Sequence, residues 1–142
     1  MKKITIILTL IAFIFINKSD AQCLQFAKTE GFAKLDTAIY IPEGRLSQLP
    51  LSQGDNIDVY KPFFRGRKYK VVVIGDNLPG MTFKVKNFQR QVLFDSSLKG
   101  NTETWEFVSD KNQNLIIHVE VPGVNEGTPI TACMAVIVGF KE

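Results

Sequence analysis

The run Met81-Thr82-Phe83-Lys84-Val85-Lys86 decides the fold class, because apolar and polar side chains alternate along its whole length. Successive side chains of an extended chain point to opposite faces, so this alternation gathers the apolar side chains on one face and the polar ones on the other. The run therefore predicts a β-strand with one face in a core and the other face in solvent.

The same period of two recurs on both sides of that run. In residues 69–74 the apolar Tyr69, Val71 and Val73 share a face, residues 104–107 alternate like the first run, and in residues 115–121 the odd-numbered positions are all apolar. Residues 132–140 are apolar at nearly every position. This last pattern predicts a strand that is central in its sheet or covered on both faces.

Turn-forming residues separate these strands, and weaker strand signals complete the pattern. The turn segments are residues 76–80, 99–101, 110–114 and 122–127. The weaker strands are predicted at residues 38–41, 57–60 and 91–94. We expect residues 76–80 to form the short loop of a hairpin. Seven or eight strands without helices between them predict an all-β protein, an antiparallel β-sandwich.

One segment departs from the period of two. Residues 24–35 have the spacing of a short helix, with Leu24, Ala27 and Phe32 on its inward side. Gly31 falls inside this segment, and glycine disfavours a helix interior by about 1 kcal/mol relative to alanine. We therefore expect at most a short helix before the first strand.

The order of the strand motifs resembles that of a known group of domains. The motifs are residues 54–73, 83–85, 92–95 and 133–139. Over roughly residues 50–142 their order is similar to that of small secreted bacterial jelly-roll domains related to pre-peptidase C-terminal domains. The resemblance implies a jelly-roll-like sandwich with a non-catalytic binding or accessory role. The acidic calcium-binding loops of some such domains have no counterpart in this sequence.

The first 21 residues are predicted to be a cleaved secretory signal peptide. Two lysines precede an apolar run over residues 4–16, which has the length of a signal-peptide core and is shorter than the about 20 residues that a membrane-spanning helix needs. Ser19 and Ala21 are the small residues that signal peptidase requires, so cleavage is expected before Gln22.

Lipid attachment at Cys23 is not expected. Acylation needs a small residue directly before the cysteine and usually a leucine three positions before it, and the sequence has Gln22 and Asp20 there. We therefore expect a periplasmic or secreted protein without a lipid anchor or a spanning helix.

The exported part is predicted to be a single domain, residues 22–142. Its net charge is near +1, because the signal peptide holds three lysines and one aspartate of a chain whose total is +3. Nucleic-acid binding needs a strongly basic surface and is not predicted. Cys23 and Cys133 are the two cysteines, and an oxidising compartment favours a disulfide between them.

No motif in the sequence indicates a particular chemistry. His118 is the single histidine and is predicted on the outward face with Glu120, with which it has the spacing to pair, so neither a catalytic set nor a zinc shell is expected. No cofactor is predicted. Trp105 has the surroundings of a core anchor, and a sugar-stacking role for it is the less favoured alternative.

The stretch Tyr60-Lys61-Pro62-Phe63-Phe64-Arg65-Gly66-Arg67-Lys68-Tyr69 is the densest local feature. Its functional interpretation is an exposed patch in which Arg65, Arg67 and Lys68 contact a protein or an anionic glycan of the cell envelope. The favoured alternative is a corner whose two phenylalanines pack in the core while the charges are solvated.

These observations favour an exported, non-catalytic binding or accessory module of the bacterial cell envelope. A small hydrolase on a sandwich scaffold and a structural subunit of a surface assembly are the alternatives. Loss of an activity on changing His118 would favour the hydrolase, and concentration-dependent assembly would favour the structural subunit. The loops at 76–80 and 122–127 are the next candidate binding surfaces after the basic corner.

Overall fold

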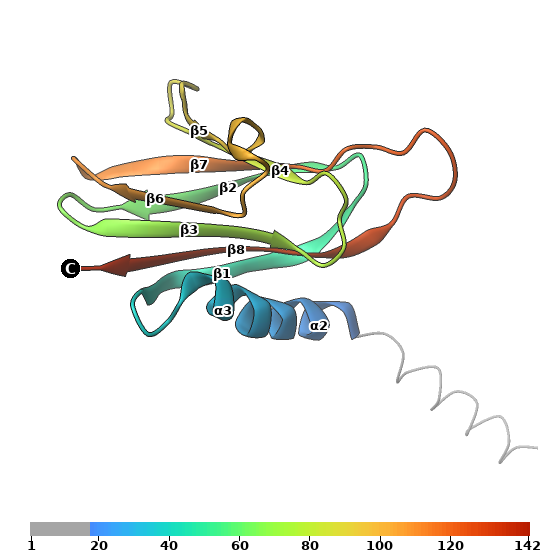
Figure 1. Cartoon of the computed structure of the whole chain (residues 1–142), viewed down its shortest axis with the longest axis horizontal. Helices are drawn as coiled ribbons and strands as arrows, with labels where there is room; N and C mark the ends of the chain where they lie inside the picture. The colour runs from blue at the N-terminus through green and yellow to red at the C-terminus, as the bar shows by residue number, and fades with distance from the viewer. Residues whose placement is uncertain (1–17) are drawn as a thin grey trace, which may run out of the picture.

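The computed structural model describes residues 18–142. Eight strands form two antiparallel sheets of four, so the predicted all-β sandwich is confirmed (Figure 1). The strands are β1 (Ile41–Ser52), β2 (Asn56–Phe63), β3 (Lys68–Gly75), β4 (Thr82–Lys86), β5 (Val92–Asp95), β6 (Thr104–Val108), β7 (Gln113–Glu120) and β8 (Thr131–Lys141).

The strand order is that of a jelly roll. Sheet A has the order β1-β8-β3-β6, and sheet B has the order β2-β7-β4-β5. Only β4 and β5 are neighbours both in sequence and in a sheet, so every other connection passes from one sheet to the other. The hairpin expected at residues 76–80 is therefore wrong. That segment carries the chain from sheet A to sheet B and buries Leu78 on the way.

The main core lies between the two sheets and is built by the alternating strands. The odd-numbered positions of β7 are buried there, as the sequence predicts. The largest of the fully buried side chains in this core are Phe63, Tyr69, Phe83, Leu115, Ile117 and Met134. Alternation of burial along β3, β4 and β7 thus positions one set of side chains inward and leaves the other set on the outer faces.

A helical segment covers the outer face of sheet A. It consists of α2 (Lys18–Phe26), the π-helical turn η1 (Ala27–Gly31) and α3 (Phe32–Leu35), and it begins before the helix that the sequence predicts. Its buried side chains pack on β3 and β8 in a second core. This packing explains why residues 132–140 are apolar on both faces: β8 lies between two neighbours in sheet A and has a core on each side.

Gly31 is required for this packing. A Cβ at Gly31 would lie 1.8 Å from Cδ1 of Ile137 on β8, so a side chain at this position has no room. Gly139 of β8 is similar, since a Cβ there would lie 2.7 Å from Cδ1 of Leu35. The helix propensity lost at Gly31 is therefore exchanged for a close approach of the helix to the sheet.

The strand predicted at residues 38–41 is wrong in its position. Residues 36–40 form the turn after α3, and the strand runs from Ile41 to Ser52. Pro42, Gly44 and Pro50 interrupt the apolar periodicity of this segment. Proline is tolerated here because β1 is an edge strand of sheet A, where an outward-facing N–H is not needed.

The predicted disulfide is confirmed: Cys23 of α2 is bonded to Cys133 of β8, with the two Cα atoms 5.1 Å apart. The bond closes a loop across 110 positions and fixes the helix to sheet A. Most of the predicted signal peptide lies outside the described residues, so its cleavage remains a prediction. Within residues 18–142 no helix is long and apolar enough to cross a membrane.

Candidate functional site

The outer face of sheet B carries a row of aligned side chains across its four strands, apolar on three of them and a lysine on β4. Strand register aligns Tyr60 of β2 with Ile116 of β7, Ile116 with Lys86 of β4, and Lys86 with Val92 of β5. Tyr60 is 58% exposed and Val92 is 52% exposed. Ile116 points away from the main core, yet it is only 4% exposed because its neighbours cover it. We call Tyr60, Ile116 and Val92 the apolar row, and Lys86 of β4 stands between its last two members.

A charged row runs beside the apolar row, two positions away from it on β2, β7 and β4 and three positions away on β5. Asp58 of β2 is aligned with His118 of β7, His118 with Lys84 of β4, and Lys84 with Asp95 of β5. Nδ1 of His118 lies 2.6 Å from Oδ1 of Asp58, and Nζ of Lys84 lies 3.9 Å from Oδ2 of Asp95. The charged row thus ends in a carboxylate on both edge strands.

The β4–β5 loop adds an aromatic ring and a guanidinium to this face. The ring of Phe88, 57% exposed, packs edge-on against Tyr60 with centroids 6.2 Å apart. Asn87 and Gln91 close the loop, because the Gln91 N–H donates to Oδ1 of Asn87 at 2.9 Å and the Asn87 amide donates to Oε1 of Gln91 at 2.7 Å. Phe88 is therefore presented by a loop with its own hydrogen bonds.

Arg90 occupies the backbone position in this loop that usually belongs to glycine. Its φ is 64°, a left-handed conformation that costs a residue with a side chain roughly 1–2 kcal/mol. Its Nη1 lies 3.9 Å from Oδ2 of Asp58, so the guanidinium extends over the charged row. A left-handed backbone conformation at a residue other than glycine indicates that the Arg90 side chain has a function at this position. We call the two rows together with Phe88 and Arg90 the outer face.

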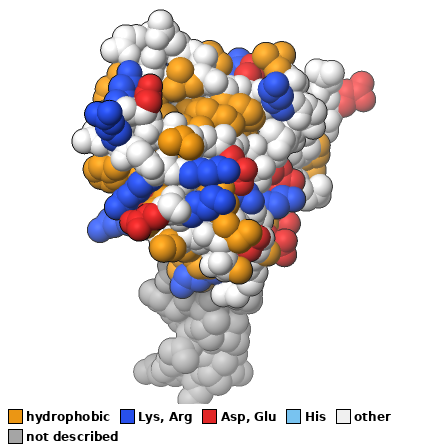
Figure 2. All heavy atoms as spheres, turned by 60° about the vertical axis from the view of Figure 1, so that its left-hand side comes forward, with side chains coloured by type: hydrophobic (Ala, Val, Ile, Leu, Met, Phe, Trp, Pro, Cys, Tyr) orange, Lys and Arg blue, Asp and Glu red, His pale blue; other side chains and the backbone are white. Residues whose placement is uncertain are grey.

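The electrostatics of the outer face are balanced between the two signs. The hydroxyl of Ser97 donates to Asp95 and holds the pKa of that carboxyl below its usual value, and the Ser97 N–H and the Lys84 ammonium act in the same direction. Asp95 therefore stays ionised opposite Lys84 in mildly acidic conditions. Figure 2, which views another side of the molecule, likewise shows Lys and Arg side chains lying among Asp and Glu side chains.

The histidine on this face is paired, but with a different carboxylate from the one that the sequence suggests. His118 lies on the outward side as predicted, and its partner is Asp58 on the neighbouring strand, not Glu120. Among residues 18–142 no serine, threonine or cysteine side chain is hydrogen-bonded to His118. The same residues hold no group of three side chains suited to a metal ion. The chemistry that the outer face offers is apolar contact and charge pairing.

The three cations of the predicted patch lie on different surfaces. Arg65 is exposed at the tip of the β2–β3 turn, and Lys68 is on the outer side of sheet A. Arg67 closes the end of the sandwich: its guanidinium lies 3.3 Å from Oε1 of Glu43 and 4.4 Å from the ring centroid of Phe140. Arg67 is thus engaged within the fold, and Arg65 and Lys68 remain exposed or half-buried around it.

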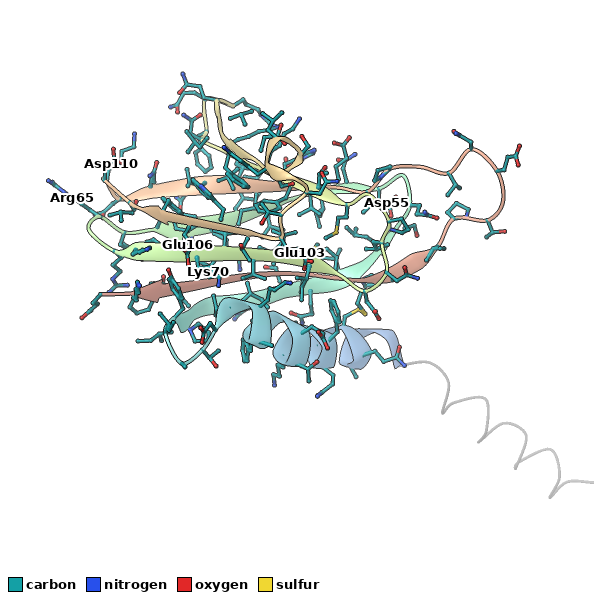
Figure 3. The ribbon with its side chains drawn as sticks, in the orientation of Figure 1. Asp55, Arg65, Lys70, Glu103, Glu106 and Asp110 are labelled. Atoms are coloured by element: carbon teal, nitrogen blue, oxygen red, sulfur yellow. A yellow bond between two sulfur atoms is a disulfide. The ribbon has the colours of Figure 1, made fainter. Side chains whose placement is uncertain are left out.

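Hydrogen bonds join the two turns at the corner that carries this patch. The Arg65 N–H donates to Oδ1 of Asn112 at 2.9 Å, and the Gly66 N–H donates to the Ser109 carbonyl at 2.8 Å, so the β2–β3 and β6–β7 turns are joined. Figure 3 shows Arg65 and Asp110 on these two turns at the same end of the molecule. Of the two phenylalanines before Arg65, the first is buried and the second is exposed, so the predicted packing of both holds for the first alone.

Trp105 packs against the main core, in line with the favoured interpretation. Its indole is stacked between Phe107, with centroids 4.2 Å apart, and Phe94, with centroids 5.3 Å apart. Both faces of the indole are therefore covered by rings. A sugar cannot stack on it without displacing one of them.

Sequence reasoning missed the outer face as a site. Tyr60 was part of the basic-aromatic stretch, but the β-strand period places it on the opposite side of β2 from Lys61 and Phe63. An aromatic residue at an outward strand position was the available signal. No local pattern in the sequence predicts where Phe88 lies, because its position depends on how the β4–β5 loop folds back over the sheet.

Two of the cavities on the described surface lie beside elements discussed above. One, of about 770 Å³, lies between the helical segment and the start of the β3–β4 connection, and it includes Thr29, Lys34 and Glu103. A smaller one, of about 290 Å³, lies between β1 and β2 over Lys61, whose Nζ donates to the Arg45 carbonyl at 2.6 Å. Burial lowers the pKa of Lys61. This lysine holds the irregular stretch of β1 in place.

Comparison with known proteins gives a likeness in fold. No family model and no curated protein matches this sequence. A crystal structure of PliG from Aeromonas hydrophila, a periplasmic lysozyme inhibitor of g-type lysozyme, is similar with a TM-score of 0.52 and 13% identity, covering 68% of this chain and 85% of that one. A designed double-stranded β-helix covers 69% of this chain and 100% of its own, with 14% identity and a TM-score of 0.31. The resemblance to pre-peptidase C-terminal domains stays a prediction.

Proposed function

We propose that this protein is an exported, non-catalytic binding module of the cell envelope, and that the outer face of sheet B binds a protein partner. One observation carries the proposal: Tyr60 and Phe88 form an exposed aromatic pair, held by a hydrogen-bonded loop, directly beside the charged row. Exposed aromatic residues beside an arginine have the composition of protein-binding hot spots.

The physical argument rests on the low cost of binding to a preformed surface. Phe88 is held against Tyr60 before any partner arrives, and the loop around it is closed by its own hydrogen bonds. A partner therefore does not have to order these side chains, which otherwise costs about 0.5–1.5 kcal/mol for each one. The Asp58 and Arg90 charges nearby can fix the orientation of the partner.

The disulfide and the likeness in fold support the compartment and the class of partner. A disulfide between Cys23 and Cys133 is typical of proteins outside the cytoplasm. PliG has a similar fold and is a periplasmic inhibitor of g-type lysozyme, so a protein partner is reasonable for a sandwich of this kind. A g-type lysozyme is accordingly the first purified protein to test.

The test is quantitative affinity capture from an envelope extract of the source organism. We expect at least one protein to be retained by the parent and lost by Tyr60→Ser/Phe88→Ser. The matched control is Ile39→Ser/Phe64→Ser, which removes two exposed apolar side chains outside the outer face. Equal retention by all three forms would contradict the proposal. Binding to a glycan array without any retained protein would point to the glycan alternative.

A further inference from the structure

The two sheets have four edge strands, β1 and β6 in sheet A and β2 and β5 in sheet B. Three of these edges carry features that hinder pairing with another strand. β1 contains two prolines and a register shift between Glu43 and Ser47, β2 contains Pro62, and β5 is four residues long with a register shift opposite Val85 and Lys86. β6 has no proline and no register shift.

The outward backbone groups of β6 follow from its register with β3. The Val73 N–H donates to the Glu103 carbonyl, and the Ser109 N–H donates to the Arg67 carbonyl. Hydrogen-bonded pairs in an antiparallel ladder occur at every second residue, so Trp105 and Phe107 also bond to β3. The N–H and C=O groups of Glu106 and Val108 therefore point away from the sheet.

The side chains of β6 define what a strand added to this edge would meet. On the inner side lie Trp105 and Phe107, both partly buried against the main core. On the outer side lies Glu106, whose carboxylate accepts a hydrogen bond from the Tyr40 hydroxyl at 2.8 Å. Figure 3 shows Glu103 and Glu106 along this part of sheet A. Glu103 precedes β6 and is paired with Lys34 at 3.7 Å, so an added strand meets aromatic rings on one side and the single carboxylate of Glu106 on the other.

We propose that β6 is a second interaction surface, which accepts an extended segment of a partner protein as an additional strand of sheet A. The segment alternates apolar residues with polar ones and places a lysine or arginine opposite Glu106. Main-chain hydrogen bonds to Glu106 and Val108 provide the pairing, and the charge provides the preference.

A second copy of this chain fits the edge less well. Two β6 strands paired antiparallel about Glu106 would set the two Glu106 carboxylates opposite each other, and like charges in that position are destabilising. Shifting the register by one pair of residues leaves them diagonal to each other. The charge on this edge therefore favours a partner with a basic residue.

This surface is separate from the outer face. The outer face belongs to sheet B, and β6 is in sheet A. The Tyr60→Ser/Phe88→Ser variant is therefore expected to keep binding at β6, and failure of one proposal does not imply failure of the other.

The test uses the exported protein and two capped peptides. Each peptide has seven residues with valine at the odd positions, threonine at positions two and six, and either lysine or glutamate at position four. Nuclear magnetic resonance follows the backbone amides during titration to millimolar peptide. We expect the lysine peptide to shift the Glu106 and Val108 amides and to bind about tenfold more tightly than the glutamate peptide, and we expect Glu106→Lys to reverse this order.

A matched pair of variants separates strand addition from simple adhesion. Val108→Pro removes one outward N–H and is expected to lose the lysine peptide, whereas Val108→Ala keeps the N–H and is expected to retain it, with the melting temperature of both recorded. Shifts that occur away from β6, the same affinity for the two peptides, the same affinity of the two variants, or no shift at millimolar peptide would each overturn the proposal.

Discussion

Replacing Gly31 by alanine tests the close packing of the helical segment on sheet A. The added methyl would lie 1.8 Å from Cδ1 of Ile137 and 3.3 Å from Cγ1 of the same residue, so Ile137 must move within a packed core. Overpacking of this kind costs about 1–3 kcal/mol, and the gain in helix propensity offsets about 1 kcal/mol of that. We expect Gly31→Ala to lower the free energy of unfolding by up to about 2 kcal/mol.

The sharper test is the double variant with Ile137→Val, which removes Cδ1, the atom that the new methyl meets. Ile137→Val alone should cost about 1 kcal/mol as a cavity mutation. The double variant should be no less stable than Ile137→Val alone, because the added methyl fills part of the space that Cδ1 leaves. Urea unfolding followed by Trp105 fluorescence measures all four forms. Gly123→Ala, at a loop glycine with room for a Cβ, is the control and should stay within about 0.5 kcal/mol. Simple addition of the two single costs would refute the reasoning.

Three further outcomes are expected. Burial, and then the hydrogen bond to Glu106, raise the pKa of Tyr40 to about 12. The stability that the protonated Tyr40 contributes is therefore complete below pH 10 and is lost as the pH rises through 12. In a series of thermal melts between these pH values, the melting temperature of Tyr40→Phe should fall less steeply with pH than that of the parent. In thermal melts Arg67→Ser should destabilise the fold by about 1 kcal/mol or more, because its guanidinium pairs with Glu43 and packs on Phe140. Arg65→Ser should change the stability by less than about 0.5 kcal/mol. Equal losses of stability in the two variants would contradict this expectation. Replacing Cys23 and Cys133 together by alanine should cost up to about 4–5 kcal/mol in urea unfolding, and an unchanged midpoint would be contrary to expectation.

Local periodicity predicted the parts of the fold that have regular alternation. The strand at residues 81–86 and the buried side of β7 follow directly from period two, since one face of each is in the core. The first strand was misplaced because proline and glycine break its pattern, and only its position at a sheet edge makes them acceptable.

Features that depend on the order of strands in space could not be predicted in this way. Residues 76–80 have a hairpin composition, but β3 and β4 belong to different sheets. His118 has a carboxylate two residues away in sequence, yet it pairs with Asp58 because β2 and β7 are neighbours. The basic patch was proposed from adjacency in sequence, while the β2–β3 turn sends Arg65 and Arg67 to different surroundings.

The central claim is that the outer face binds a protein partner, and the dissociation constant of Tyr60→Ser tests it most directly. The measurement is surface plasmon resonance against the captured partner, with the parent and Phe64→Ser alongside. A hot-spot side chain contributes about 2 kcal/mol or more, which corresponds to a roughly 30-fold rise in the dissociation constant. We predict a rise of that size for Tyr60→Ser and less than about twofold for Phe64→Ser. A folded Tyr60→Ser variant with the parent's dissociation constant would contradict the claim.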